Sequence, residues 1–243
     1  MSGFLGSGTL YFNRVVSGVS QGWLALGNAT KFAIKENSEK KERKLKKRGQ
    51  YGQVGDSVFV KQPAELSINL DDIDAQNLAL AFLGDVSAVS VTAGSVTDEA
   101  VTADLGFYVP LANREVSNVV VTNSAATVTY VAGTDYEVVA GAGMLKALSG
   151  GAITDAESLL VDYDYAAISG NKVLGGTNPT VKLALKLDGE NFANSAPVLV
   201  DVWEAVLSPT SEVDFLADDF AAIELAGTLN TPTSKTSPYE VTL

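Results

Sequence analysis

The chain has 243 residues, no cysteine, no histidine and a formal net charge of −12. These absences exclude cysteine nucleophiles, thiolate or imidazole metal sites and histidine acid–base catalysis, and they leave carboxylate or serine–lysine enzymes as the open enzymatic classes. The length fits one large domain or two small ones.

The first 14 residues contain no basic region followed by an apolar run, so we expect no signal peptide. The longest apolar stretch, residues 78–83, is far too short to cross a bilayer, so we expect no membrane insertion. A protein of this kind is expected to be soluble and intracellular when it is made.

A basic run interrupts this acidic chain directly after a strand-like segment at residues 30–36. Residues 35–48 hold eight bases and three acids, a net charge of +5, whereas the remaining residues hold nine bases and 26 acids, −17. Three interpretations are open: a nucleic-acid site, a solvated loop, or a contact with an acidic second copy. The run lacks the interleaved aromatic residues that stack on bases, which favours the protomer contact.

The run lies between strand-like segments at 29–35 and 54–61, so we predict a hairpin with a long loop over residues 36–53. Glutamates in the run precede a base by four residues, the spacing that stabilises helical ion pairs, so the loop could become helical on a partner. The predicted contact residues are Lys40, Lys41, Arg43, Lys44, Lys46, Lys47 and Arg48.

Strict alternation over residues 64–71 predicts a strand with one buried face. A short helix of about ten residues follows, with Asp72 or Asp74 as N-cap, acids in the first turn and Gly84 as its stop. Its apolar residues, from Leu78 to Phe82, predict that it packs against a sheet.

The composition changes near residue 85 to short segments rich in valine, threonine, alanine and glycine. Strands predicted at 116–122, 126–131, 135–139 and 159–165, with turn residues between them, indicate a small sandwich-like insertion. We therefore expect a first domain made of residues 1–84 and 170–243 and an inserted domain made of residues 85–169.

After the insertion, alternation predicts strands at 180–188 and 220–229, and the more apolar segment 198–207 predicts a central strand covered on both faces. The acid pairs Asp218–Asp219 and Asp162–Asp164 have the residue types of a metal site, but solvated acids are the favoured interpretation of both. The glycine-rich turns at 6–8 and 141–143 complete no phosphate-binding pattern. We therefore expect no catalytic residues, metal or cofactor.

Three stretches together resemble the major tail tube proteins of long-tailed (siphovirus-type) bacteriophages. "AELSINLDDIDAQNLALAFLGD" is similar to that family's strand followed by a short helix. "TVTYVAGTDYEVV…GMLKALSGGAI…SLLVDYDY" is similar to a stretch found in many of its members, and "SEVDFLADDFAAIELAGTLNTP" is similar to its C-terminal strands. The basic run lies where the family has a long hairpin loop.

The resemblance implies a mainly β fold: a β-sandwich or partial barrel with one flanking helix and an outward-facing, immunoglobulin-like insertion. It implies a structural virion protein whose hexameric rings stack into a tube for DNA ejection, assembled in the host bacterial cytoplasm. Its implied partners are other copies of itself, the tail tip or baseplate, the tape measure and tail terminator proteins, and double-stranded DNA in non-specific passage.

An acidic lumen suits such a conduit, because it repels phosphates and lets the duplex slide. The candidate lumen residues are the polar residues of the alternating strands, namely Glu65, Asn69, Asp71, Asp188 and Glu224. Lys182 and Lys186 share these strands, so they must pair with neighbouring acids or lie at a protomer boundary.

Two other classes remain open. One is a virion decoration, surface-layer or adhesive β-protein whose middle domain binds a ligand. The other is a carboxylate-dependent hydrolase. Stacked rings with a central channel would distinguish the tube from both.

Overall fold

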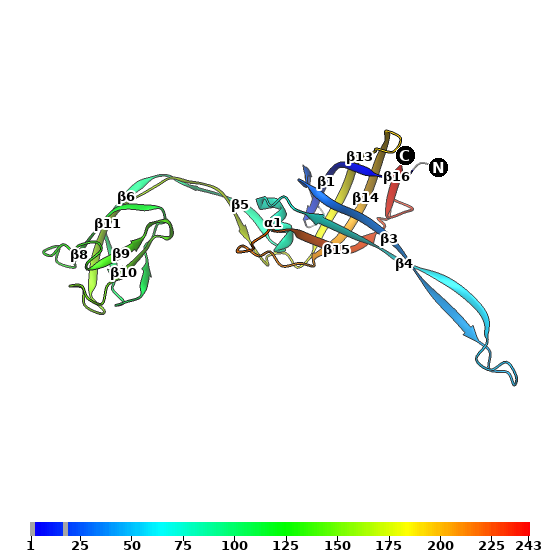
Figure 1. Cartoon of the computed structure of the whole chain (residues 1–243), viewed down its shortest axis with the longest axis horizontal. Helices are drawn as coiled ribbons and strands as arrows, with labels where there is room; N and C mark the ends of the chain where they lie inside the picture. The colour runs from blue at the N-terminus through cyan, green and yellow to red at the C-terminus, as the bar shows by residue number, and fades with distance from the viewer. Residues whose placement is uncertain (1–2, 17–18) are drawn as a thin grey trace. The chain divides into compact units, whose positions relative to one another are not determined.

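A computed structural model describes residues 3–16 and 19–243, and these residues are mainly β, with 59% of the chain in strands (Figure 1). This confirms the expected β class. The chain divides into two compact units: unit 1 comprises the chain up to Ser87 and from Lys172 onward, and unit 2 comprises Ala88–Asn171.

Unit 1 contains a single eight-stranded sheet with the strand order β2-β1-β13-β14-β15-β4-β3, in which β16 also pairs with β14. All of its ladders are antiparallel. Its strands are β1 (Gly6–Val16), β2 (Val19–Ala25), β3 (Ala29–Lys44), β4 (Val54–Leu70), β13 (Val181–Asn191), β14 (Ala196–Pro209), β15 (Ile223–Asn230) and β16 (Tyr239–Thr242).

The core of unit 1 lies on one face of this sheet. Leu10 from β1, Ile68 from β4 and Leu185 from β13 are fully buried in the same apolar cluster. Residues of β1 and β13 also line a pocket together with Phe32 of β3, although β3 is at the far end of the strand order. The sheet therefore curls so that its two ends approach each other around the core.

One seven-residue helix, α1 (Ala75–Ala81), covers part of this core. The Asp74 side chain accepts a hydrogen bond from the Asn77 backbone N–H at 2.7 Å, and the Gly84 N–H closes the other end by donating to the Ala79 carbonyl at 2.7 Å. The predicted cap and stop are confirmed. The predicted acids of the first turn lie before the helix instead, which begins at Ala75 and is shorter than expected.

The strand β14 corrects one prediction. Val198, Val200, Val202, Ala205 and Leu207 are buried on the core face, but the alternate residues are not buried. The expectation that both faces are covered was wrong, because apolar side chains such as that of Leu199, 43% exposed, also occupy the polar face of the sheet.

Two paired strands, β5 (Asp85–Val91) and β12 (Ile168–Leu174), connect unit 1 to unit 2. Unit 2 consists of two three-stranded sheets around its own apolar cluster, in which Val121 and Val161 are fully buried. Its elements are β6 (Gly94–Thr102), β7 (Tyr108–Pro110), β8 (Val116–Asn123), β9 (Tyr136–Val139), a 3-10 turn (Ala140–Ala142), β10 (Met144–Ala147) and β11 (Ser158–Tyr165).

The strand predicted at 126–131 does not form. The segment is irregular: it makes an isolated bridge between Thr129 and Thr122, and the Tyr130 N–H donates to the Val121 carbonyl. The Tyr130 side chain is buried in the core of unit 2, so apolar periodicity at this position reflects core contacts without a regular ladder.

Candidate functional site

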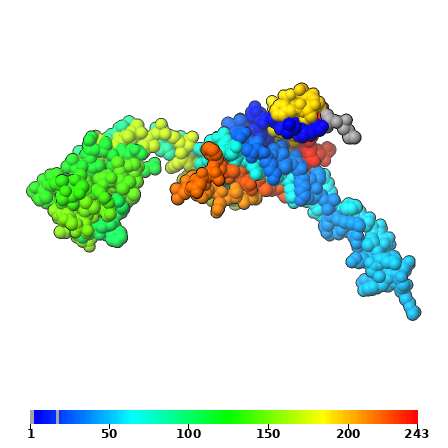
Figure 2. Space-filling view, in the orientation of Figure 1, coloured from blue at the N-terminus to red at the C-terminus, as the bar shows by residue number. Residues whose placement is uncertain are grey.

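The basic run is part of a long β-hairpin. The ladder between β3 and β4 runs from the pair Ala29–Leu70 to the pair Lys44–Val54. We call residues 38–61 the distal hairpin; in unit 1 they form a narrow arm drawn in blue and cyan (Figures 1 and 2). The predicted loop over 36–53 was therefore wrong, and the turn spans residues 45–53 only.

The turn is closed by its own backbone. The Leu45 N–H donates to the Gln53 carbonyl at 2.8 Å, and the Gly52 N–H donates to the Leu45 carbonyl at 2.9 Å. Gly49 and Gly52 have φ values of 81° and 85°, a region that glycine enters without steric cost. The turn holds Lys46, Lys47 and Arg48 at the end of the arm.

The charges of the distal hairpin pair as strand residues. Lys40 contacts Glu42 at 2.7 Å, and Lys41 contacts Glu39, so each pair lies two residues apart on one face of β3. The Lys40 hydrogen bond and charge lower the pKa of Glu42. In this chain the run forms a strand and not a helix, because residues 54–61 supply a pairing strand rich in β-branched and aromatic residues.

Apolar side chains of the distal hairpin have no cover within the described part of the chain. Phe59 is 66% exposed, Val58 59% and Val60 43%. In the ladder Phe59 is opposite Lys40 and Val58 is opposite Lys41, so the two faces of the hairpin both carry an apolar residue beside a base.

Four of the five predicted lumen residues share the polar face of the unit 1 sheet. The Asn69 side-chain amide donates to Glu224 at 3.1 Å, and Lys35 contacts Glu65 at 3.2 Å. Asp188 of β13 pairs with Leu199 of β14, so it lies on the same polar face. Asp71 lies beyond the end of β4, where it accepts a hydrogen bond from the Asn28 amide at 2.7 Å.

The two lysines of β13 pair with acids of β14. Lys182 lies 3.7 Å from Glu204, and Lys186 contacts Asp201 and also lies over the Trp23 ring, 5.6 Å from its centre. Of the two expected alternatives for these lysines, pairing with neighbouring acids is the one observed. Lysines and acids on the polar face thus pair across neighbouring strands.

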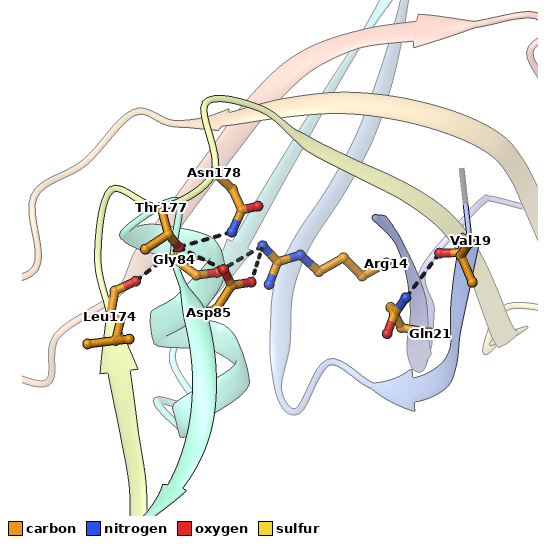
Figure 3. A network of polar contacts seen from close by, with 8 residues as sticks. All are labelled: Arg14, Val19, Gln21, Gly84, Asp85, Leu174, Thr177 and Asn178. Atoms are coloured by element: carbon orange, nitrogen blue, oxygen red, sulfur yellow. Dashed lines mark hydrogen bonds and ion pairs between the residues drawn. The ribbon is translucent and has the colours of Figure 1, made fainter. Parts of the chain in front are cut away.

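A further site in unit 1 was not predicted (Figure 3). The Arg14 side chain, 12% exposed, donates from Nη2 to the Gly84 carbonyl at 2.8 Å and lies 3.4 Å from the Asp85 carboxylate. Thr177 donates its hydroxyl to Asp85 at 2.8 Å. Hydrogen bonds from Thr177 and Asn178, with the Arg14 charge, lower the pKa of Asp85. Arg14 thereby holds the start of β5, and Asp85 in turn links it to Thr177, which follows β12.

The two acids of β11 in unit 2 accept hydrogen bonds from the neighbouring strands β6 and β8. Asp162 accepts from the Asp98 N–H at 2.7 Å, and Asp164 accepts from Ser95 and Asn118, which lower its pKa. Asp218 and Asp219, the other acid pair considered, are exposed in the β14–β15 connection of unit 1. Within residues 3–16 and 19–243, no group of three or more acidic side chains is arranged to hold a metal ion.

The fold and the site therefore define a mainly β protein of two units with an exposed, basic hairpin. The chain belongs to the family described as protein of unknown function UCP028589, whose model matches residues 3–240. No curated protein matches the sequence of this chain. Among the described residues, no helix has the length and apolarity needed to span a membrane.

Proposed function

We propose that this chain is a non-enzymatic, self-assembling virion protein that forms the tail tube of a long-tailed bacteriophage. Hexameric rings of the protein stack into a tube, and DNA leaves the capsid through the tube. The observation that carries the proposal is the distal hairpin, whose apolar residues are exposed on both faces beside basic side chains.

An isolated two-stranded hairpin is marginally stable in water, and exposed apolar residues gathered in one place mark interaction surfaces. Phe59, Val58 and Val60 are such residues, and they gain cover if the hairpin lies against another copy. The net charge of +5 on residues 35–48 and of −17 on the rest of the chain favours that partner electrostatically.

The sheet edges support ring formation in the same way. β2 and β3 are the terminal strands of the unit 1 order, and terminal strands present backbone groups that another chain can pair with. Pairing β2 of one copy with β3 of the next repeats around a ring until the ring closes, which removes these edges.

The polar face of the sheet suits the lumen of such a tube. Its acids outnumber its lysines: Lys35, Lys182 and Lys186 are each paired with an acid, and Lys31 lies opposite Asn69 on the same face. A net negative wall repels the phosphates of DNA and leaves few bases available to hold the duplex. The acids of this face are Glu65, Asp188, Glu190, Asp201, Glu204, Glu224 and Glu240.

The remaining partners follow from the resemblance: the tail tip or baseplate, the tape measure protein and the tail terminator. Assembly takes place in the bacterial cytoplasm, and the finished protein is in the virion. Unit 2 is an immunoglobulin-like decoration that faces outward. No cofactor or catalytic residue is part of this proposal.

A second candidate function is a decoration, surface-layer or adhesive protein in which unit 2 binds a ligand. Phe107 and Tyr108, 66% and 45% exposed on unit 2, favour it, because exposed aromatic residues are frequent at binding sites. In that case the protein binds its ligand through unit 2 without forming tubes.

Electron microscopy of the purified protein at high concentration, with and without tail-tip initiators, tests the proposal. We expect stacked rings with a central channel. A protein that stays monomeric under both conditions contradicts the tube and favours the second candidate.

The distal hairpin offers a sharper test. Residues 38–61 are replaced by an Asn-Gly turn, which joins Asn37 to Gln62, the next pair of the ladder. We expect unit 1 to fold and tubes to be lost. Reversing the charges of Lys40, Lys41, Arg43 and Lys44 keeps the hairpin length and should weaken stacking most at low salt. Normal tubes from the shortened variant would contradict the role of the hairpin.

A further inference from the structure

The connection between β14 and β15 in unit 1 is acidic and also exposes large apolar side chains. We call residues 211–222 the acidic loop; it contains four acids and no base. Phe220 is 100% exposed, Leu216 93% and Phe215 72%. Neither its sequence context nor the resemblance assigns this loop a role.

The acidic loop is anchored to unit 1 at both ends. The Thr210 N–H donates to the Glu224 carbonyl at 2.9 Å, and the Glu224 N–H donates to the Ser211 hydroxyl at 3.0 Å. Val213 packs against the core of unit 1. The Phe215 ring lies 6.0 Å from the ring of Phe82, directly after α1. Leu216 and Phe220 are therefore presented outward from a fixed base.

The distal hairpin matches this surface in both charge and polarity. Lys46, Lys47 and Arg48 lie in the turn, and Tyr51 of the same turn is 79% exposed. The acidic loop provides the opposite charge and its own exposed aromatic ring. A contact between the two buries apolar area on each side and brings unlike charges together at the rim.

The position of the two surfaces determines which copy can supply the hairpin. The acidic loop ends where Ile223 of β15 pairs with Leu70, at one end of β4, whereas the turn of the distal hairpin, residues 45–53, adjoins the other end (Figure 1). β4 has 17 residues, so at about 3.3 Å per residue the two surfaces are roughly 50 Å apart. The hairpin of one copy can therefore meet the acidic loop of another in a head-to-tail contact.

We propose that the acidic loop is the receptor for the turn of the distal hairpin of a second copy of this chain. Because donor and receptor lie at opposite ends of β4, the contact does not close a dimer and repeats without limit. This inference rests on the proposed function, and it identifies which surface of the neighbouring copy the hairpin reaches.

Cysteine cross-linking tests the contact directly, because the chain contains no cysteine of its own. We expect the variant with both Tyr51→Cys and Phe220→Cys to give a ladder of disulfide-linked multimers after mild oxidation of assembled protein. A mixture of the two single variants should give mainly dimers, and each single variant should stay monomeric on a denaturing, non-reducing gel. All of these positions are exposed, so the variants should fold.

Phe107→Cys combined with Tyr51→Cys is the matched control. Phe107 is an exposed aromatic residue of unit 2, so random collisions would cross-link it equally well. Only the Phe220 pair should give the ladder. Dimers from Tyr51→Cys alone at equal yield would show that hairpins meet each other, and that result would overturn the proposal.

A charge exchange tests specificity. The loop variant carries Glu212→Lys, Asp218→Lys and Asp219→Lys, and the hairpin variant carries Lys46→Glu, Lys47→Glu and Arg48→Glu. Each should raise the protein concentration needed for assembly by about tenfold or more, and the combination should restore it to within about threefold. Loss of assembly in the combined variant overturns the proposal.

The outcomes separate this inference from the proposed function. If electron microscopy shows tubes but the Tyr51→Cys/Phe220→Cys variant gives no cross-linked multimers, the acidic loop is not the receptor. The proposed tube function then still stands. A wild-type protein that never assembles overturns both.

Discussion

The charged side chains of unit 2 and those of the distal hairpin in unit 1 serve different purposes. In unit 2, Asp135 accepts hydrogen bonds from the N–H groups of Val131 and Ala152 at 2.7 and 2.8 Å, so the carboxylate stabilises the fold. In the distal hairpin of unit 1, Glu39 and Glu42 contact lysines of the same strand. Such pairs stabilise little, so the charges of the hairpin are available for other molecules.

Within unit 1, apolar residues of one strand also differ in how far they are covered. Ile68 of β4 is fully buried, whereas Phe59 of the same strand is 66% exposed. β4 pairs with β3 at both positions, on either side of a register shift at Lys35/Asn37, so backbone pairing alone does not require a core. Unit 1 thus contains a region that folding needs and a region that folding does not need.

The largest expected change in stability tests this difference between the core region and the distal hairpin. Ile68→Ala should lower the free energy of unfolding of unit 1 by about 2–5 kcal/mol, because it leaves a cavity in the core. Phe59→Ala should change it by less than about 0.5 kcal/mol. Denaturant titrations followed by tryptophan fluorescence report unit 1 alone, since Trp23 and Trp203 both belong to it. Equal losses in the two variants would show that the distal hairpin contributes to the fold.

A smaller effect is expected from a buried hydrogen bond of unit 2. The Tyr136 hydroxyl donates to the Val119 carbonyl at 2.9 Å, and the side chain is 2% exposed. Tyr136→Phe should destabilise unit 2 by about 1 kcal/mol, because that carbonyl loses its donor. Hydrogen exchange of unit 2 peptides measures it, and Tyr51→Phe in the exposed turn is the control. A change in the tryptophan transition would mean that the units unfold together.

The pH dependence should separate the units next. Hydrogen bonds from the Val131 and Ala152 N–H groups lower the pKa of Asp135, and the Thr154 N–H and Tyr130 hydroxyl lower that of Glu157. A lowered pKa stabilises the fold above the ordinary value near 4, and this stability is lost as the pH falls. We expect the unit 2 Tm to drop by a few degrees between pH 6 and pH 3, measured by calorimetry.

At alkaline pH the stability of unit 2 should fall as the pH rises, which is the opposite of the acid dependence. The Glu157 hydrogen bond raises the pKa of Tyr130 to about 12, so its contribution is complete below pH 10 and is lost as the pH rises toward 12. In Glu157→Gln, both the acid and the alkaline loss should be smaller than in the wild type. Unchanged profiles would show that this pair does not stabilise unit 2.

The smallest effect is expected on the polar face of unit 1. Glu65→Gln removes an exposed pair with Lys35 and should change stability by less than about 0.5 kcal/mol. If this face lines a lumen, the same substitution leaves tubes intact, which electron microscopy shows. A loss of stability near that of Tyr136→Phe would mean that the exposed carboxylates of this face also stabilise unit 1.

Alternation and caps predicted much of unit 1. The alternating apolar residues of 64–71 and 180–188 became buried residues of β4 and β13, and Asp74 and Gly84 delimit α1 as expected. Local patterns suffice there because one face of each strand meets the core. They do not suffice for β1, whose glycines and single charges give no clear period.

The candidate site was harder to predict because its structure depends on residues distant in the sequence. The charges of 36–48 have helical spacing, but pairing with residues 54–62 determines a strand. Arg14 is a lone base in the sequence and acquires its role only when Gly84 and Asp85, about 70 residues later, lie beside it. No local pattern contains that information.

The continuity of β4 has a mechanical consequence. The strand that pairs with β15 in the sheet is the same strand that extends into the arm, and a register shift, not a loop, lies between the two parts. Its ladder bonds are perpendicular to the strand, so a pull on the tip along the strand axis loads them together, in shear. Tension applied to the arm is therefore shared by the whole sheet of unit 1, which suits a part that must carry load without unravelling.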